Sequence, residues 1–378
     1  MHSLVKVVCL TLFSLSSINC LAETYRRDNY RDIKMLGRGG AGVAVVDGGQ
    51  SAFFNPAGIG ATKTYNIQFI DSSFGLNYNF RESFGALTNV VGGGNADQTL
   101  SQMLEPLVGL PLRFQGGIFP HIAIPNFMFG VWDYFDGDML YRDPVYPRFH
   151  IDGRNDSGLI MGTGGGIMDR IFFGASLRYQ KRREVYETLT ADSLLGNYST
   201  LLTTLQKRGE GFGLNVGMQA KQPLSGGKQF LAVGVAVEDV GYTRFKNATR
   251  LPPPRRQNQA VNAGVGYGFN TPLLTGQLLL DVKRLQETNV SYTKRIHTGI
   301  ELSTLMMDFR GGLYQGYWAA GWSLRLGKMG TFDLSSYGEE LGAIAGQQVN
   351  RIFLMGFTLG IELKKNQGKQ RRFTLDKL

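Results

Sequence analysis

Isolated basic residues stand at alternate positions of apolar segments in this sequence, where they could bind an anion. A carboxylate removed from water needs a charged donor, which Lys and Arg side chains provide. Acidic residues occupy equivalent positions, so the two signs could instead form ion pairs that hold an interior together. The candidate anion-binding residues are Arg178, Lys221, Lys283 and Arg325, and the accompanying acidic residues are Glu238, Asp281, Glu301 and Glu362.

Catalytic chemistry has little support in the sequence. Of the three histidines after residue 22, His297 falls on the same side of an alternating segment as Glu301. No Ser-His-acid signature accompanies this pair, and we interpret it as a polar contact. There is no metal-ligand spacing, phosphate-binding loop or dinucleotide fingerprint. The sequence therefore predicts a non-enzymatic protein with no catalytic residue, metal or cofactor.

The segments that carry these charges are predicted to be β-strands with one apolar and one polar face. In residues 351–363, for example, Phe353, Met355 and Phe357 alternate with Gly356 and Thr358. A soluble β-sandwich also alternates, but its apolar face must meet a second apolar face. An apolar outer band around a polar, glycine-dotted lumen is typical of a transmembrane barrel, and lipid leaves no partner for an open strand edge. We therefore predict an all-β fold, a closed antiparallel transmembrane β-barrel.

The number of strands and the lengths of their connections support a barrel. Long connections near 80–111, 188–207, 243–256 and 342–349 alternate with tight turns at 125–126, 168–170, 225–228, 270–272 and 327–330. Bacterial barrels have short periplasmic turns and longer outer loops. We expect about fourteen strands, at 63–79, 112–124, 126–142, 146–168, 170–187, 208–223, 228–242, 257–270, 273–286, 290–304, 307–316, 317–327, 329–341 and 350–364.

Both ends of the chain have distinctive compositions. Residues 1–22 resemble a cleaved export signal, with Lys6, a short apolar run and a small-residue site at Ala22. Both cysteines, Cys9 and Cys20, lie in this segment, so we expect no disulfide in the mature chain. The net charge of +10 includes six Lys/Arg and one acidic residue between Lys364 and Leu378. This concentration argues against a nucleic-acid partner, and we predict a barrel at 63–365 and a basic periplasmic tail at 366–378, either solvated or bound to an acidic partner or lipid.

A glycine-rich segment precedes the first predicted strand. It contains SAFFNPAGIG, Ser51 to Gly60, for which we expect neither a helix nor a regular strand, because Pro56 and the glycines break both. Fourteen strands enclose a lumen that side chains alone do not fill. We predict that residues 23–62 form a hatch in this lumen rather than a disordered leader. The residues of this hatch motif are Phe53, Phe54, Asn55, Pro56, Ala57 and Gly58.

The run GRGGAGVAVVDGGQSAFFNPAGIGA resembles the N-terminal signature of the FadL-type outer-membrane transporter superfamily. The resemblance implies a 14-stranded barrel with an N-terminal hatch and passive uptake of long-chain fatty acids or similar hydrophobic molecules. The later half of the chain looks more like relatives in conjugation and type IX secretion systems. These relatives imply the alternative function, a non-enzymatic barrel that binds exported polypeptides.

These patterns together predict a protein of the Gram-negative outer membrane. Its expected partners are membrane lipid and a hydrophobic small-molecule ligand, and the alternative function adds an exported or periplasmic protein. Two long loops show helical apolar spacing, at 100–107 and 194–205. These apolar stripes either cover the barrel rim or line an apolar groove through which a ligand enters.

Overall fold

The computed structural model describes residues 28–80, 83, 108–142, 148–190, 205–247, 252–288, 290–327, 329–342 and 345–364. The predicted export signal, the basic tail from residue 366 and nearly all of the two helical loop stripes lie outside these residues. Within the described part of the chain, no helix is long and apolar enough to cross a membrane.

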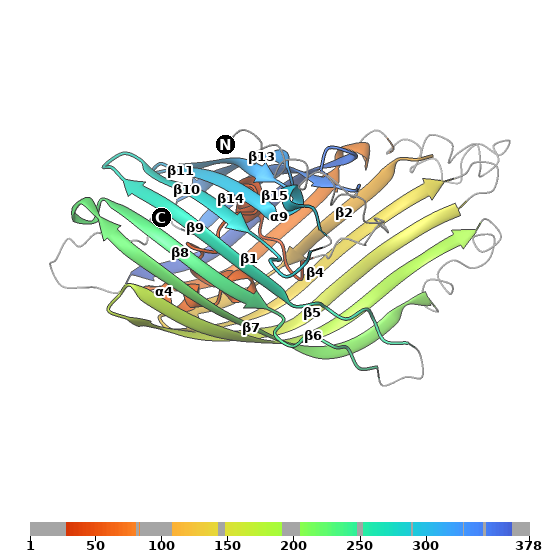
Figure 1. The fold of residues 1–378 in the computed structure, drawn as a ribbon, viewed down its shortest axis with the longest axis horizontal. Helices are drawn as coiled ribbons and strands as arrows, with labels where there is room; N and C mark the ends of the chain where they lie inside the picture. The colour runs from red at the N-terminus through yellow and green to blue at the C-terminus, as the bar shows by residue number, and fades with distance from the viewer. Residues whose placement is uncertain are drawn as a thin grey trace, which may run out of the picture.

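The strands form one antiparallel sheet that closes where β1 pairs with β15 (Figure 1). Each strand otherwise pairs with its neighbours in the chain, apart from β2 and β3. The strands are β1 (Thr64–Asn77), β2 (Pro111–Ile118), β3 (His121–Ile124), β4 (Phe127–Arg142), β5 (Arg148–Ile167), β6 (Ile171–Thr190), β7 (Lys207–Leu224), β8 (Gln229–Glu238), β9 (Ala260–Asn270), β10 (Thr275–Val282), β11 (Ile296–Ser303), β12 (Met307–Tyr314), β13 (Tyr317–Leu326), β14 (Gly330–Glu340) and β15 (Val349–Lys364). The short helices are α2 (Ile33–Gly37), α3 (Ser51–Phe54), α4 (Ala57–Ala61), η2 (Ser225–Gly227) and α9 (Tyr292–Arg295).

The fifteen strands form a barrel of fourteen staves, because β2 and β3 together occupy the place of one strand. Both strands lie between β1 and β4, β2 toward one end of the barrel and β3 toward the other. The predicted strand at 112–124 is therefore interrupted, at Phe119 and Pro120. Proline has no N–H group to donate to a ladder, whereas the Phe119 amide still donates to the Asp71 carbonyl at 2.7 Å. The prediction of about fourteen barrel strands is confirmed, with this one divided.

The outer face of the barrel is apolar. In β8, Leu231, Val233 and Val235 are 47–51% exposed, whereas Ala232 and Gly234 between them are buried. The same alternation is seen along β15, where Phe353, Met355 and Phe357 face outward as predicted. Apolar area of this extent on the outside of a closed barrel is explained by contact with lipid.

The connections differ between the two ends of the barrel. One end, the turn end, carries the short connections 125–126, 168–170, 225–228, 271–274, 304–306 and 327–329. The opposite end, the loop end, carries the longer connections and also the two-residue turn 315–316 between β12 and β13. Asn126, Met168 and Asp169 in these turns have positive φ. Strands β4 to β7 have 16–20 residues, whereas β8 to β13 have 8–11. The barrel is consequently taller on the β4–β7 side (Figure 1).

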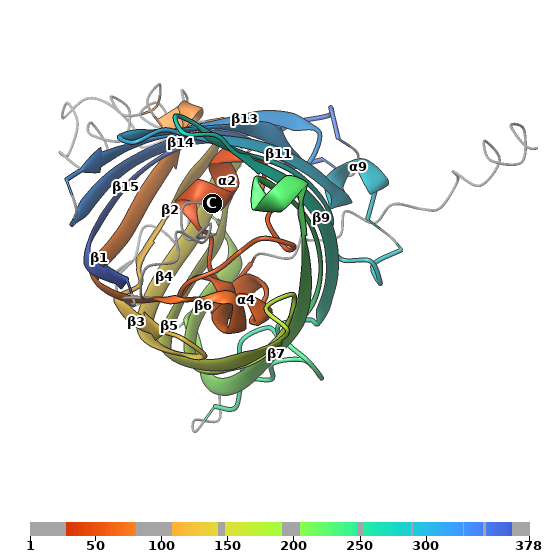
Figure 2. The same cartoon turned by 90° about the vertical axis from the view of Figure 1, so that its left-hand side faces the viewer.

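Residues 28–62, called the plug here, lie inside the barrel. Figure 2 shows this segment, with helices α2 and α4, crossing the space enclosed by the strands. Most of its residues are buried, although fewer than half are in regular structure. Its glycines allow this because their backbone can approach the wall closely.

Candidate functional site: the plugged lumen

Contrary to the prediction of no helix in this segment, the Asn-Pro-Ala-Gly motif joins two short helices, α3 and α4, which contact β5, β6 and β7. Each helix has only four or five residues, and Pro56 is tolerated because it lies at the start of α4. The Asn55 side-chain amide donates to the Val43 carbonyl at 2.7 Å, and its oxygen accepts from the Ala57 amide at 3.2 Å. Pro56, with φ of −60°, directly precedes α4, where a missing N–H costs nothing. Phe53 and Phe54 are also buried. The six predicted motif residues thus form one folded unit inside the barrel.

Two wall glycines form the seat for this motif. A Cβ built on Gly174 of β6 would overlap the Pro56 carbonyl, and one built on Gly217 of β7 would overlap the Asn55 side chain. Any larger residue at either position would have to displace the plug backbone or Asn55. The motif therefore fits against the wall only because Gly174 and Gly217 have no side chains.

Polar side chains of the wall also bind the plug backbone. Ser176 and Asn215 donate to the Ala52 carbonyl at 2.6 and 2.9 Å. Gln219 donates to the carbonyls of Val43 and Val46 at 3.2 and 3.0 Å. These bonds replace those that helices or strands would otherwise provide for the irregular plug.

Side chains of β10 and β11 also form hydrogen bonds with the plug backbone. Asp281 accepts hydrogen bonds from the Gly42 and Val43 amides at 2.7 and 2.9 Å. His297 Nδ1 lies 2.8 Å from the Gly39 carbonyl. His297 and Glu301 both face the lumen as predicted, but their bonds are to the plug, because Glu301 pairs with Arg38 at 3.0 Å.

Ion pairs join the plug to the wall near the loop end. Arg31 pairs with Glu339 at 3.0 Å, and Asp28 pairs with Arg284 at 3.1 Å. Arg113 also contacts Glu339 and pairs with Asp136 at 2.8 Å. Desolvated charges of opposite sign are thereby matched across the lumen.

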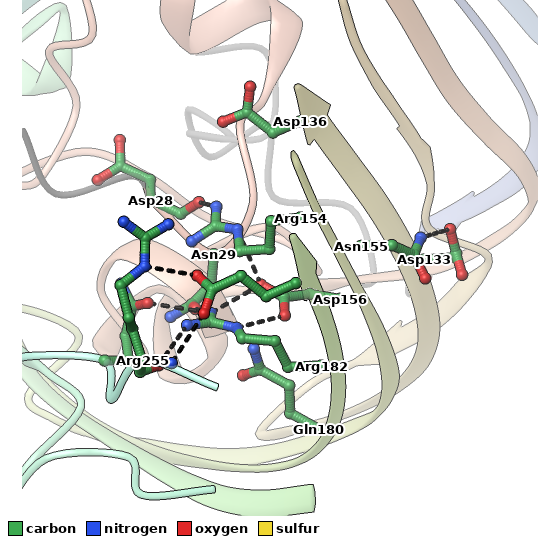
Figure 3. Close-up of polar contacts among 12 residues, drawn as sticks. Asp28, Asn29, Asp133, Asp136, Arg154, Asn155, Asp156, Gln180, Arg182 and Arg255 are labelled. Atoms are coloured by element: carbon green, nitrogen blue, oxygen red, sulfur yellow. Dashed lines mark hydrogen bonds and ion pairs between the residues drawn. The ribbon is translucent and has the colours of Figure 1, made fainter. Parts of the chain in front are cut away.

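A second group of charges lines the tall wall. Figure 3 shows Asp156 of β5 between Arg154 and Arg182, and Arg255 reaching the same group from the β8–β9 loop. Arg182 also donates to Asn29 of the plug at 3.2 Å. Arg255 pairs at 2.8 Å with each of two strand carboxylates, Asp152 and Glu184.

The four predicted anion-binding residues lie in separate parts of the wall. Arg178 is buried and pairs with Asp239 at 2.6 Å, which matches the ion-pair interpretation of lumenal charges. Lys221 lines a polar cavity of about 180 Å³ with Glu362, near the turn end. Lys283 follows β10 at the loop end, and Arg325 pairs with Asp308 at the turn end. The structure does not gather them into one site, and their role in ligand binding stays a prediction.

A polar cavity of about 200 Å³ separates the plug from β10 and β11. Lys34, Arg38, Asp47 and Glu301 are among its lining residues. Burial raises the pKa of Asp32, although Lys34 and the Met35 amide oppose this shift. The Asp333 carboxylate raises the pKa of Lys34, against the effect of burial. Within the described residues, no three His, Cys, Asp or Glu side chains are arranged to hold a metal ion.

Sequence reasoning missed the aromatic cluster beside the break between β2 and β3. Phe53 of the plug stacks on Tyr30 with ring centroids 4.7 Å apart. Phe119 and Trp132 meet the same Phe53 ring edge-on at 5.1 and 5.4 Å, and Tyr134 meets Tyr30 at 5.8 Å. Trp132 and Tyr134 are two residues apart in β4 and therefore both face inward. This spacing of two large aromatic residues is the signal in the sequence that would have predicted an apolar patch here.

Sequence reasoning also missed most of the ion-pair network. Asp152, Arg154 and Asp156 recur at every second residue of β5, and Arg178, Arg182 and Glu184 share one face of β6. That spacing places each set on the lumenal side. The sequence therefore contained the pattern of lumenal charges, but it did not show which charged residues pair with one another.

A closed antiparallel barrel with an apolar outer face, a polar lumen and an internal plug defines the class as a plugged transmembrane β-barrel. No family model matches the sequence, and no curated protein sequence matches it.

Solved structures similar to the chain include transporters of the superfamily that the N-terminal motif resembles. The Ralstonia pickettii toluene transporter TbuX is 11% identical, with a TM-score of 0.47, over 89% of this chain and 99% of its own. The Pseudomonas putida toluene transporter TodX is 8% identical, with a TM-score of 0.48, over 90% and 99%. A Pseudomonas aeruginosa FadL homologue is 10% identical, with a TM-score of 0.38, over 88% and 98%. At TM-scores below 0.5, these structures assign neither substrate nor mechanism to this chain.

Proposed function

We propose that this chain is a passive outer-membrane channel for hydrophobic small molecules, held closed by its plug. The observation that supports this function is the aromatic cluster of Tyr30, Phe53, Phe119, Trp132 and Tyr134. Hydrated ions alone would gain nothing from an apolar patch of this size. Inside a wall lined mostly by charges, the cluster provides a surface that an apolar solute can occupy.

The plug itself fills the place that a ligand would take. Phe53 lies between Tyr30, Phe119 and Trp132, and its side chain is a small hydrophobic group held by aromatic faces and edges. Displacement of α3 would leave a cavity lined by wall residues of similar chemistry. An aromatic hydrocarbon or one segment of a fatty acyl chain could then replace the Phe53 ring.

The break between β2 and β3 offers a way for this cavity to change shape. Pro120 donates no ladder bond, and Phe119 beside it is completely buried against the plug. In our proposal the ligand enters at the loop end, which faces outside, and leaves when the plug or this break shifts. The channel is non-enzymatic, and the export signal at 1–22 is cleaved. Long-chain fatty acids or similar hydrophobic molecules are its proposed ligands.

A reversible lock on the plug tests the proposal. A Cβ built on Gly217 lies 2.9 Å from Asn55 Cγ, near the place that the sulfur of a cysteine at residue 55 would take. The double variant Asn55→Cys/Gly217→Cys can therefore form a disulfide without large movement. The sequence has no cysteine beyond residue 20, so no other disulfide competes in the processed chain.

Uptake of radiolabelled oleate and toluene would be measured in cells that lack other hydrophobic channels. We expect the oxidised double variant to take up neither compound above background, and reduction of the same protein to restore uptake. Each single cysteine variant controls for the loss of Asn55 or Gly217. Equal uptake in the oxidised and reduced forms, or a polypeptide that copurifies while neither compound is transported, would contradict the proposal.

A further inference from the structure

A groove of about 480 Å³ lies on the outer face of β13, β14, β15 and β1. Its volume is within the range of about 300–1,000 Å³ that is usual for small-molecule sites. Outward-facing apolar side chains form most of its lining, among them Phe74, Leu76, Trp322, Leu334, Phe353 and Met355.

The strand register explains why a groove forms here. Ala320 of β13 is paired with Ser336 of β14, which is paired with Phe353 of β15. In the adjacent outward-facing row, Trp322, Leu334 and Met355 follow one another in the same way. Two small residues on neighbouring strands thus lie beside a row of large ones. The small pair forms a depression, and the large side chains border it.

The groove does not lead into the lumen. A Cβ built on Gly37 of α2 would lie 3.0 Å from the Gly321 Cα and 2.7 Å from the Ser335 hydroxyl oxygen. Ser335 also donates to the Ile33 carbonyl at 2.8 Å. Helix α2 therefore closes the inner side of the wall directly behind the groove. A molecule in the groove has no path through this wall, so the groove suits docking rather than passage.

A cation lies next to the groove on the side of the loop end. Arg351 precedes Phe353 by two residues on the same outward face and is paired with Gly338. Its guanidinium lies 3.7 Å from the centroid of the Trp318 ring, and it donates to the Trp318 carbonyl at 2.7 Å. Among the described residues no carboxylate forms an ion pair with Arg351. Trp318 is 56% exposed on the outer face, as expected of an aromatic residue at a membrane–water interface.

We propose that this groove is a binding site for one anionic membrane lipid. An acyl chain lies over Ala320 and Ser336, and the phosphate of its headgroup contacts Arg351. The groove supplies apolar surface for the chain, and the fixed cation at the interface supplies the charge that an anionic headgroup requires. The site depends on the membrane location of the barrel but not on its uptake function.

Lipid retention in mild detergent tests this site by native mass spectrometry. The full chain would be reconstituted with dioleoyl phosphatidylglycerol or dioleoyl phosphatidylcholine, which have identical chains, and then extracted. We expect wild type to retain one phosphatidylglycerol and to prefer it at least about fivefold in an equimolar mixture. Ser336→Phe and Ala320→Phe, on different strands, should each lose the retained lipid by filling the groove. Arg351→Gln should retain a lipid but lose the preference.

Ala175→Phe is the matched control, because Ala175 faces outward on β6 between Thr163 and Val216 in the strand register. It should retain the lipid as wild type does. Heat-modifiable gel mobility establishes that each variant is folded. Retention of phosphatidylglycerol by both groove-filling variants, its equal loss from Ala175→Phe, or an unchanged preference in Arg351→Gln would overturn the site. Uptake of oleate by Ser336→Phe is expected to be normal, so the two proposals succeed or fail separately.

Discussion

Arg31 of the plug and Glu339 of β14 form an ion pair of 3.0 Å, although 308 residues separate them in the sequence. Their side chains are 1% and 4% exposed. Arg31 also donates to the Tyr337 hydroxyl at 2.9 Å, and Glu339 is shared with Arg113. Removing one partner of a buried pair leaves a charge without compensation, which costs about 3–5 kcal/mol. The position of the plug therefore depends on this contact.

Arg31→Met should loosen the plug, by less than the roughly 3–5 kcal/mol of a fully uncompensated charge, because Arg113 still contacts Glu339. Hydrogen exchange of the amides in residues 33–62 would measure the change. Arg31→Met/Glu339→Gln should recover part of it, because the carboxylate that lost one of its two cations is then neutral and Arg113 still pairs with Asp136. Lys63→Met is the control, since the Lys63–Asp169 pair is 39% and 80% exposed and is worth less than about 1 kcal/mol. Equal effects of the two single variants would contradict the prediction.

Gly174→Ala should displace the Asn-Pro-Ala turn, because the new methyl group would overlap the Pro56 carbonyl. We expect a destabilisation of about 1–3 kcal/mol, as for other overpacked interiors. Limited proteolysis within residues 47–62 would measure exposure of the turn. Gly165→Ala on β5 is the matched control, since a Cβ there meets no atom within 4 Å. Protection of the turn in both variants would show that the glycine seat is not needed.

Phe53→Ala should leave a cavity in the aromatic cluster and cost about 3–5 kcal/mol. Toluene should then raise the unfolding temperature of the variant more than that of wild type, because it binds only where Phe53 is missing. Phe173→Ala, which removes a phenylalanine that is 41% exposed on the outer face, should show no such gain. A toluene effect equal in all three proteins would indicate partition into the detergent or lipid instead.

Arg255→Gln should free the β8–β9 loop from the mouth of the barrel. The change removes both ion pairs to Asp152 and Glu184, whose side chains are 6% and 2% exposed. Hydrogen exchange at residues 255–259 should become faster by at least about tenfold, the equivalent of 1.4 kcal/mol. Arg256→Gln is the adjacent control, because Arg256 stacks on Tyr242 at 4.9 Å from the ring centroid and forms no described ion pair. Unchanged exchange in Arg255→Gln would rule out this restraint.

Local pattern was sufficient to predict the wall of the barrel. Period-two alternation places Leu231, Val233 and Val235 outside and their neighbours inside whatever the rest of the chain does. The alternation of short and long connections then orders the strands and separates the two barrel ends. The Asn55–Pro56 motif likewise predicted a compact segment, although it did not reveal that a short helix lies on each side of the motif. Each of these features depends on residues only a few positions apart, so it can be predicted from a single sequence.

Closure of the barrel decided which residues meet across the lumen. Alternation along β14 places Glu339 and the adjacent Glu340 on opposite faces, but it does not predict that Glu339 pairs with Arg31 or that Glu340 accepts loop amides. The break at Phe119, the division of the predicted anion-binding residues among separate contacts and the groove over Ala320 and Ser336 also depend on register between strands. Register and plug position are set by packing among segments that lie far apart in the sequence. The sequence therefore determined which face each side chain takes, whereas only the tertiary structure determined its partner.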